Sequence, residues 1–206
     1  MSSFRRVERE GAQEISVIFT SQEAHVLINL TEQLLELLAE GDGQSHQVDP
    51  LLHLVGISSS DALPEDPVLR RLLPNAYDDE KAAGEFRRYT EHGLREKKRA
   101  HALMIYEALL PQDEEWNGDT PLEKGSINVT FSMSDAMAWL GGLNDLRLAL
   151  AVRLGIGIEK GAPAPSNHQQ KYELMVDADP MKAVYAVYSW IGWLQQSLLD
   201  ALTDDK

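Results

Sequence analysis

The sequence predicts a mainly α protein, a helical bundle of about five or six helices with a small antiparallel β element. Three observations support this prediction. Apolar residues recur at helical spacing over several long segments, Pro and Gly interrupt these segments, and only short runs alternate in the period of a strand. Because the alternating runs are expected to share one sheet, residues 1–206 are expected to form a single mainly helical domain.

The β element is predicted to combine an amino-terminal hairpin with a central strand. Two extended runs, 4–7 and 14–19, flank a polar stretch that contains Gly11, and the second run alternates apolar and polar residues. A similar alternation occupies 127–131, at a constant offset of 112 residues. A capping pair follows each of these two alternating runs, so each predicted strand is expected to lead directly into a helix. The pairs are Thr20 with Glu23 and Ser132 with Asp135.

Six helical segments are expected from apolar spacing, N-caps and terminating Gly or Pro. They are 20–41, 50–55, 66–74, 79–111, 133–154 and 180–202. The core face of the fourth is expected to consist of Ala82, Phe86, Tyr89, Leu94, Ala100, Leu103, Met104 and Leu109. The last helix is apolar nearly all round in its first half, which predicts either a central place in the bundle or burial in a partner.

Composition excludes several classes of function. The chain has 19 Lys and Arg against 33 Asp and Glu, a net charge of −14, so general nucleic-acid binding requires a locally basic face. The 0 Cys exclude a disulfide, a thiolate zinc site, an iron–sulfur cluster and a cysteine nucleophile. The 6 His are scattered, and no phosphate-binding Gly-rich loop or nucleophile elbow is found. We therefore expect no metal, no cofactor and no enzymatic activity.

A cytoplasmic location is expected. The amino terminus carries Arg5 and Arg6 but lacks the apolar stretch of a signal peptide. The most apolar segment, 183–194, is shorter than the roughly 20 residues of a membrane span.

The fifth predicted helix contains a polar group inside an apolar run, Asn144, Asp145 and Arg147. Gly141 and Gly142 precede Asp145 by one helical turn, so another backbone is expected to approach closely and bury this carboxylate. A buried carboxylate requires a cation. The candidate partners are Arg70, Arg71, Arg87, Arg88 and Arg95. A structural ion pair is preferred over a functional site.

Residues 85–101 form a basic stretch with a local net charge of +3. Its basic residues are Arg87, Arg88, Arg95, Lys97, Lys98 and Arg99. Helical spacing places Arg88, His92, Arg95 and Arg99 on one side, where they would meet phosphates, an acidic protein or acids of this chain such as Asp113, Glu114 and Glu115. A solvated, internally paired face is the preferred interpretation.

Four motifs in the same order resemble one family. They are 66–74 (DPVLRRLLP), 85–90 (EFRRYT), 143–150 (LNDLRLAL) and 187–190 (VYSW). The chain resembles an actinobacterial domain family of unknown function, often encoded beside the ClpS adaptor, whose members are labelled AosR, oxidation-sensing transcription regulators. The resemblance implies a bacterial regulator that acts with a sigma factor or RNA polymerase. A thiol switch is excluded here because the chain has no Cys, and its 6 Met and 4 Trp are weak substitutes.

The leading hypothesis is therefore a non-enzymatic regulator that docks a partner protein. One alternative is direct DNA binding through 85–101, and another is a small-molecule sensor or enzyme centred on Asp145. Homodimerisation through Trp190 and Trp193 is a further expectation of lower weight.

Overall fold

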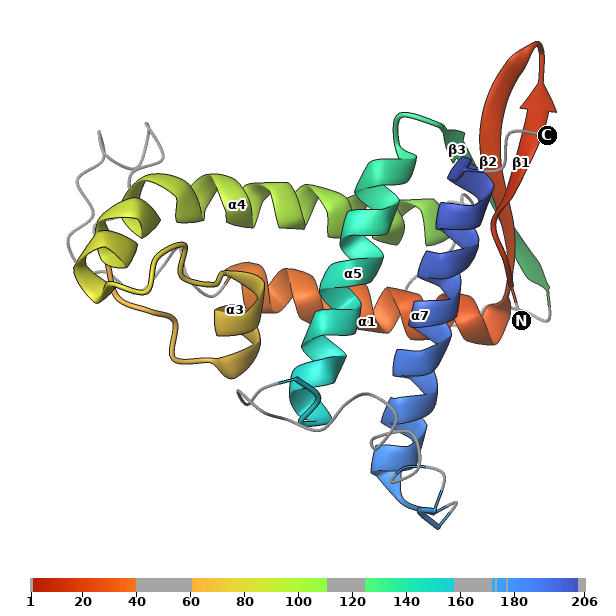
Figure 1. The fold of residues 1–206 in the computed structure, drawn as a ribbon. Helices are drawn as coiled ribbons and strands as arrows, with labels where there is room; N and C mark the ends of the chain where they lie inside the picture. The colour runs from red at the N-terminus through yellow and green to blue at the C-terminus, as the bar shows by residue number, and fades with distance from the viewer. Residues whose placement is uncertain are drawn as a thin grey trace.

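The computed structural model describes residues 2–39, 61–110, 125–157, 172, 174–176 and 178–203. Within these ranges the chain forms five helices and a three-stranded sheet, which confirms the predicted fold class. The elements are β1 (Arg5–Arg9), β2 (Ala12–Thr20), α1 (Ser21–Ala39), α3 (Pro67–Leu72), α4 (Glu80–Leu109), β3 (Ser126–Ser132), α5 (Ala136–Arg153) and α7 (Pro180–Thr203). The helices α1 and α4 lie side by side, α5 crosses both and packs against α7, and the sheet stands at one end (Figure 1).

The sheet is antiparallel in the order β1-β2-β3. Glu10 and Gly11 both have positive φ, 50° and 81°, as a two-residue type I′ turn requires. This confirms the hairpin. Val17 pairs with Val129, so the two similar runs, which lie 112 residues apart, are neighbours in the sheet as predicted. Their shared apolar side faces the core, because Ile15 and Phe19 are fully buried and Val17 and Val129 nearly so.

Capping side chains fix where the helices begin. The Thr20 backbone N–H donates to Glu23 Oε2 (2.9 Å), and the Glu23 N–H donates to Thr20 Oγ1 (3.2 Å), which confirms the capping box before α1. The Asp135 N–H donates to Ser132 Oγ (3.3 Å), but α5 starts at Ala136 because 133–135 form a turn. The helix α3 has its predicted cap, since Asp66 Oδ1 accepts from the N–H groups of Val68 and Leu69.

The five described helices and the sheet contribute to one hydrophobic cluster. Trp139 of α5 is fully buried at its sheet end, stacks on Phe131 at 4.8 Å between ring centroids, and meets Phe4 edge-on at 5.8 Å. Arg6 joins the sheet to the end of α7 by donating to the carbonyl oxygens of Ala201 (3.1 Å) and Leu202 (2.8 Å). No helix among the described residues is long and apolar enough to span a membrane.

Two expectations about helix packing are corrected. The first half of α7 is not central: each of its residues up to Trp190 is half-buried or exposed, and the buried residues begin at Ile191. The fourth helix buries only the end of its predicted apolar face: Leu109 is in the core and Met104 packs against it, whereas Ala100 and Leu103 are exposed, and the amino-terminal part is described below. The short helix predicted at 50–55 and the acids Asp113, Glu114 and Glu115 lie outside the described residues.

Candidate functional site

The helices α4 and α5 cross where two glycines of α5 face α4. A Cβ atom added to Gly141 would lie 2.5 Å from His101 Nδ1. One added to Gly142 would lie 2.6 Å from Ile105 Cδ1 and 3.1 Å from the backbone oxygen of His101. The absence of side chains at these positions therefore allows the two helices to approach closely, as the sequence predicted.

Asp145 lies one turn after these glycines and is buried, with 3% of its surface exposed, as the sequence predicted. Its partner among the described contacts is not one of the candidate arginines, so the prediction of an arginine partner is corrected. Instead, Lys98 Nζ of α4 donates to Asp145 Oδ1 at 2.7 Å. The lysine reaches the carboxylate because it lies on the side of α4 that faces α5, one turn before Ala102, which is fully buried.

His101 borders the same ion pair. Burial lowers the pKa of His101 below its usual value, Lys97 and Lys98 lower it further, and the carboxylate of Asp145 acts in the opposite direction. The ring therefore favours its neutral form. A neutral imidazole packed over Gly141 leaves Lys98 as the cation that balances Asp145.

Two of the expected arginines form a second buried network in the amino-terminal half of α4. Arg87 and Arg95, each 6% exposed, both pair with Glu91, at 2.5 Å and 2.8 Å. Arg87 also donates to Leu73 O (3.3 and 3.4 Å) and to Asn75 Oδ1 (2.7 Å). Arg95 donates to Leu38 O at 3.2 Å, which satisfies a carbonyl of the last turn of α1.

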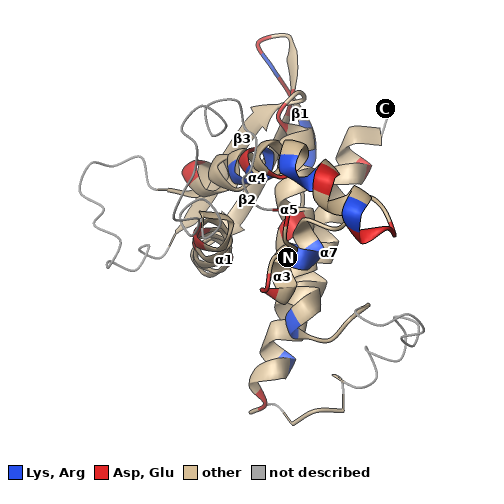
Figure 2. Cartoon of the chain, turned by 90° about the vertical axis from the view of Figure 1, so that its left-hand side faces the viewer, with Lys and Arg blue, Asp and Glu red and all other residues tan. Residues whose placement is uncertain are grey.

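The remaining predicted site residues are spread over the molecule. Arg70 donates to the carbonyl oxygens of Pro64 (2.7 Å) and Glu65 (2.9 Å), and Arg71 is exposed. Arg88 is half-buried, Lys97 is exposed, and Arg99 Nε lies 3.6 Å from Glu96 Oε1. Figure 2 shows Lys and Arg interleaved with Asp and Glu along α4 rather than gathered on one basic face. Arg95 of the expected ridge is buried and paired with Glu91, which agrees with the preferred interpretation of an internally paired face.

On the opposite flank of α5, Arg147 faces α7. Its guanidinium lies 5.0 Å from the centroid of the Tyr188 ring and donates to Gln195 Oε1 at 3.3 Å, while its buried Nε has no hydrogen-bond partner among the described residues. Asn144 is exposed. Asp145 and Arg147 therefore serve different helix pairs and do not form one site.

The two tryptophans of the expected dimer face are already used within the chain. Trp190 is half-buried against the core. Trp193 is 47% exposed and donates from Nε1 to Ser2 O at 3.2 Å. Homodimerisation through this face stays a prediction.

The amino-terminal half of α4 is inverted relative to its prediction. Its buried residues are Ala83, Gly84, Arg87 and Arg95. Phe86, Tyr89 and Leu94, which were expected in the core, are 43%, 64% and 38% exposed. The physical reason is that Arg87 and Arg95 occupy the inward side, where they donate to carbonyl oxygens of Leu73 and Leu38 and are paired with Glu91. The apolar side of this half is left at the surface.

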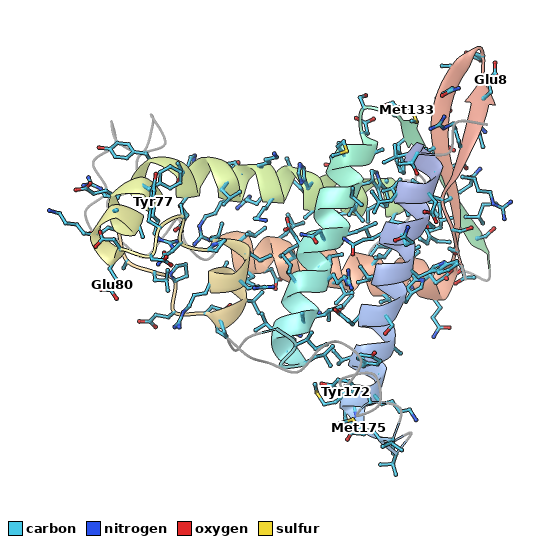
Figure 3. All side chains as sticks on the ribbon, viewed as in Figure 1. Glu8, Tyr77, Glu80, Met133, Tyr172 and Met175 are labelled. Carbon is cyan, nitrogen blue, oxygen red and sulfur yellow. The ribbon has the colours of Figure 1, made fainter. Side chains whose placement is uncertain are left out.

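Tyr77, just before α4, extends this apolar side. Its ring meets Phe86 edge-on, with centroids 5.6 Å apart and an interplanar angle of 88°. We call Tyr77, Phe86, Tyr89 and Leu94 the aromatic surface. Figure 3 shows Tyr77 and Glu80 at the end of the molecule remote from the sheet. Sequence reasoning missed this surface, although the opposite charges at 87, 91 and 95 signalled a second face of α4 that was able to pack inward.

A cavity of about 210 Å³ opens beside the aromatic surface. Its lining comes from the α3–α4 connection and from α4, and includes Leu73, Pro74, Phe86, Leu94, Arg87 and Glu91. Pockets for drug-sized ligands have volumes of about 300–1,000 Å³, so this cavity suits a single side chain better. Among the described residues, no group of three His, Asp or Glu side chains is arranged to hold a metal ion.

Comparison with known proteins places the chain in a family. The family model described as "Domain of unknown function (DUF2017)" matches residues 1–202. The chain belongs to the DUF2017 family. It is 32% identical over 210 residues to "Oxidative stress regulator AosR" of Mycobacterium tuberculosis (strain ATCC 25618 / H37Rv), covering 98% of this chain and 88% of the relative. The Mycobacterium bovis protein of the same name matches equally well. No solved structure matches the chain significantly.

Membership of DUF2017 confirms the resemblance found in the sequence. Relatives named as regulators over nearly the full length of the chain support a regulatory role in general terms. The shared family does not specify a mechanism, and this chain has 0 Cys.

Proposed function

We propose that this DUF2017 protein is a non-enzymatic regulator that works by docking a partner protein, with a sigma factor or RNA polymerase as the partner class. The observation that carries the proposal is the inverted half of α4, in which charged side chains are buried and aromatic side chains are exposed. Exposed aromatic residues are common in protein interfaces, and contiguous apolar patches on soluble proteins frequently mark interaction sites.

The buried charges support docking over direct DNA binding. Of the six basic residues of 85–101, Arg87 and Arg95 are tied to Glu91, and Lys98 is tied to Asp145. Three cations are therefore engaged in ion pairs inside the protein. Arg99 also lies 3.6 Å from Glu96, and the whole chain carries a net charge of −14. Such a surface attracts a phosphate backbone weakly.

The same contacts disfavour an enzyme or sensor centred on Asp145. A general acid or base must come within hydrogen-bond reach of its substrate. Asp145 is 3% exposed and already accepts from Lys98, so its described contacts are those of a structural ion pair.

The proposal is tested by measuring binding of the purified chain to RNA polymerase core enzyme and to individual sigma factors of the organism that encodes it. We expect a stable complex with at least one of these proteins and weak, salt-sensitive binding to promoter DNA. Tight binding of a defined promoter duplex by the isolated chain at physiological salt would contradict the proposal.

Two variants add a control for the role of Asp145. Asp145→Asn removes the charge that pairs with Lys98, and we expect it to lower stability without changing partner affinity in the folded fraction. A small molecule that stabilises the native chain, but not a folded Asp145→Asn variant, would favour the sensor alternative. Met137→Ser, at a 66% exposed position on α5, serves as a surface control.

A further inference from the structure

We infer that the aromatic surface and its cavity receive a segment of a partner protein in which an apolar side chain is flanked by Lys or Arg. This inference rests on the proposed function and specifies the chemistry of the partner. It depends on three properties of the site: the size of the cavity, the hydrogen bonds that Arg87 in its lining already makes, and the sign of the charges around it.

The cavity is suited to an apolar anchor rather than to a charged one. Its floor contains Arg87, but the terminal nitrogens of this guanidinium already donate to Leu73 O, Asn75 Oδ1 and Glu91 Oε2. An incoming carboxylate would have to displace these hydrogen bonds. An apolar side chain would instead contact Leu73, Pro74, Phe86 and Leu94, and would leave the buried ion pair intact.

One aromatic ring, Phe86, lines the cavity, and two more lie close to it in the aromatic surface. Phe86 is held by its edge-on contact with Tyr77, and it lines the cavity while remaining 43% exposed. Tyr89, 64% exposed, lies three residues further along α4 and on the same side. Partly exposed rings beside a small cavity have the form of a docking site for one anchor residue.

The exposed charges nearby are mostly acidic. Lys81 and Arg88 are the two basic residues of 77–90 apart from the buried Arg87. Four acids lie in the same stretch: Asp78, Asp79, Glu80 and Glu85. With a chain charge of −14, this surface favours basic residues on either side of the anchor and repels acidic ones. The same charges disfavour a second copy of this chain and disfavour nucleic acid, although aromatic rings also stack on bases.

The test uses three short fluorescent peptides that share one central Phe-Leu pair. The flanking residues are Lys and Ser in the first, Glu and Ser in the second, and Ser alone in the third. Binding to the full chain is measured by fluorescence anisotropy at low and physiological salt. We expect the Lys peptide to bind about tenfold or more tightly than the Glu peptide, and added salt to reduce this difference.

Surface variants locate the binding. Phe86→Ser and Tyr89→Ser change exposed residues and are expected to fold, which circular dichroism checks. We expect Phe86→Ser to weaken binding of the Lys peptide by about tenfold. Met137→Ser, which lies outside the aromatic surface, should leave it unchanged.

The inference is overturned if the Glu and Lys peptides bind equally, if Met137→Ser weakens binding as much as Phe86→Ser does, or if oligodeoxythymidine binds the aromatic surface more tightly than the Lys peptide.

Failure of this inference can be told apart from failure of the proposed function. A chain that binds a transcription protein with an affinity unchanged by Phe86→Ser retains the function but refutes the inference. A chain that binds the Lys peptide through Phe86 but none of the transcription proteins refutes the proposed partner class and supports the inference.

Discussion

The two halves of α4 bury opposite kinds of residue. The carboxy-terminal half buries Ala102, Ile105 and Leu109, which are all fully inaccessible. The amino-terminal half buries Arg87 and Arg95 around Glu91 and exposes its aromatic residues. One helix therefore holds the bundle together at one end and presents an apolar surface at the other. The difference shows that an apolar stripe on a helix does not always face the core. Another face of the same helix can pack inward when its charged side chains pair with one another.

The largest effect is expected from Glu91→Ala. Removal of this carboxylate leaves Arg87 and Arg95 buried without their shared anion, which should lower the free energy of unfolding by about 3–5 kcal/mol. Chemical denaturation monitored by circular dichroism measures this change. Glu96→Ala is the matched control on the same helix, because Glu96 is half exposed and only 3.6 Å from Arg99. Its effect should stay within about 0.5 kcal/mol. Equal effects of the two substitutions would refute a structural role for the buried network.

Ile105→Ala tests the apolar half of the helix. Ile105 is fully buried beside Gly142 of α5, so its truncation should cost about 2–5 kcal/mol in unfolding free energy. Phe86→Ala in the inverted half removes more atoms, but from a ring that is 43% exposed. We expect it to cost less than about 1.5 kcal/mol, because much of the ring is in water before the change. If chemical denaturation shows a larger loss of unfolding free energy for Phe86→Ala than for Ile105→Ala, the assignment of the core half and the surface half of α4 is wrong.

A third pair of substitutions tests the close approach of α4 and α5 where the two halves meet. Gly142→Ala places a methyl group 3.1 Å from the backbone oxygen of His101, and should destabilise the fold by about 1–3 kcal/mol. Gly93→Ala is the matched change on the exposed side of α4, where an added Cβ has no neighbour within 4 Å. It should stabilise the helix by about 0.5–1 kcal/mol, since Ala loses less backbone entropy than Gly. Thermal unfolding of both variants gives the two signs directly, and the same sign for both would argue against a tight crossing.

Local sequence was sufficient for the sheet and for much of the helix layout. The alternation through Val17 and Val129, with the capping pair after each run, predicts two strands that enter helices, and the structure pairs them. Burial of Asp145 was also predictable, because flanking glycines imply a close neighbour. These features depend on residues within a few positions of one another.

The partner of Asp145 and the exposure of the aromatic residues were not predictable in this way. Lys98 meets Asp145 because of the register in which α4 crosses α5, which is a property of the packed molecule. On α4, the stripe through Phe86 and Tyr89 and the stripe through Arg87, Glu91 and Arg95 both have helical periodicity. The choice between them depends on carbonyl groups at Leu38 and Leu73, which are distant in sequence and able to accept from the arginines.

The smallest expected effect concerns the pH dependence of the crossing. His101 lies there beside Asp145, Lys97 and Lys98, and burial lowers its pKa in the folded protein. The folded state then binds fewer protons than the unfolded chain between that lowered pKa and the usual value of about 6.5. Stability from this group is therefore complete above about pH 6.5 and is lost as the pH falls through that window. Replacement by Gln removes the titration, so unfolding free energies measured across this pH range should fall less steeply in His101→Gln than in the native chain. An identical slope in both proteins would show that His101 has the same pKa in the folded and unfolded states. Water would then reach the crossing of α4 and α5 well enough to solvate a protonated His101.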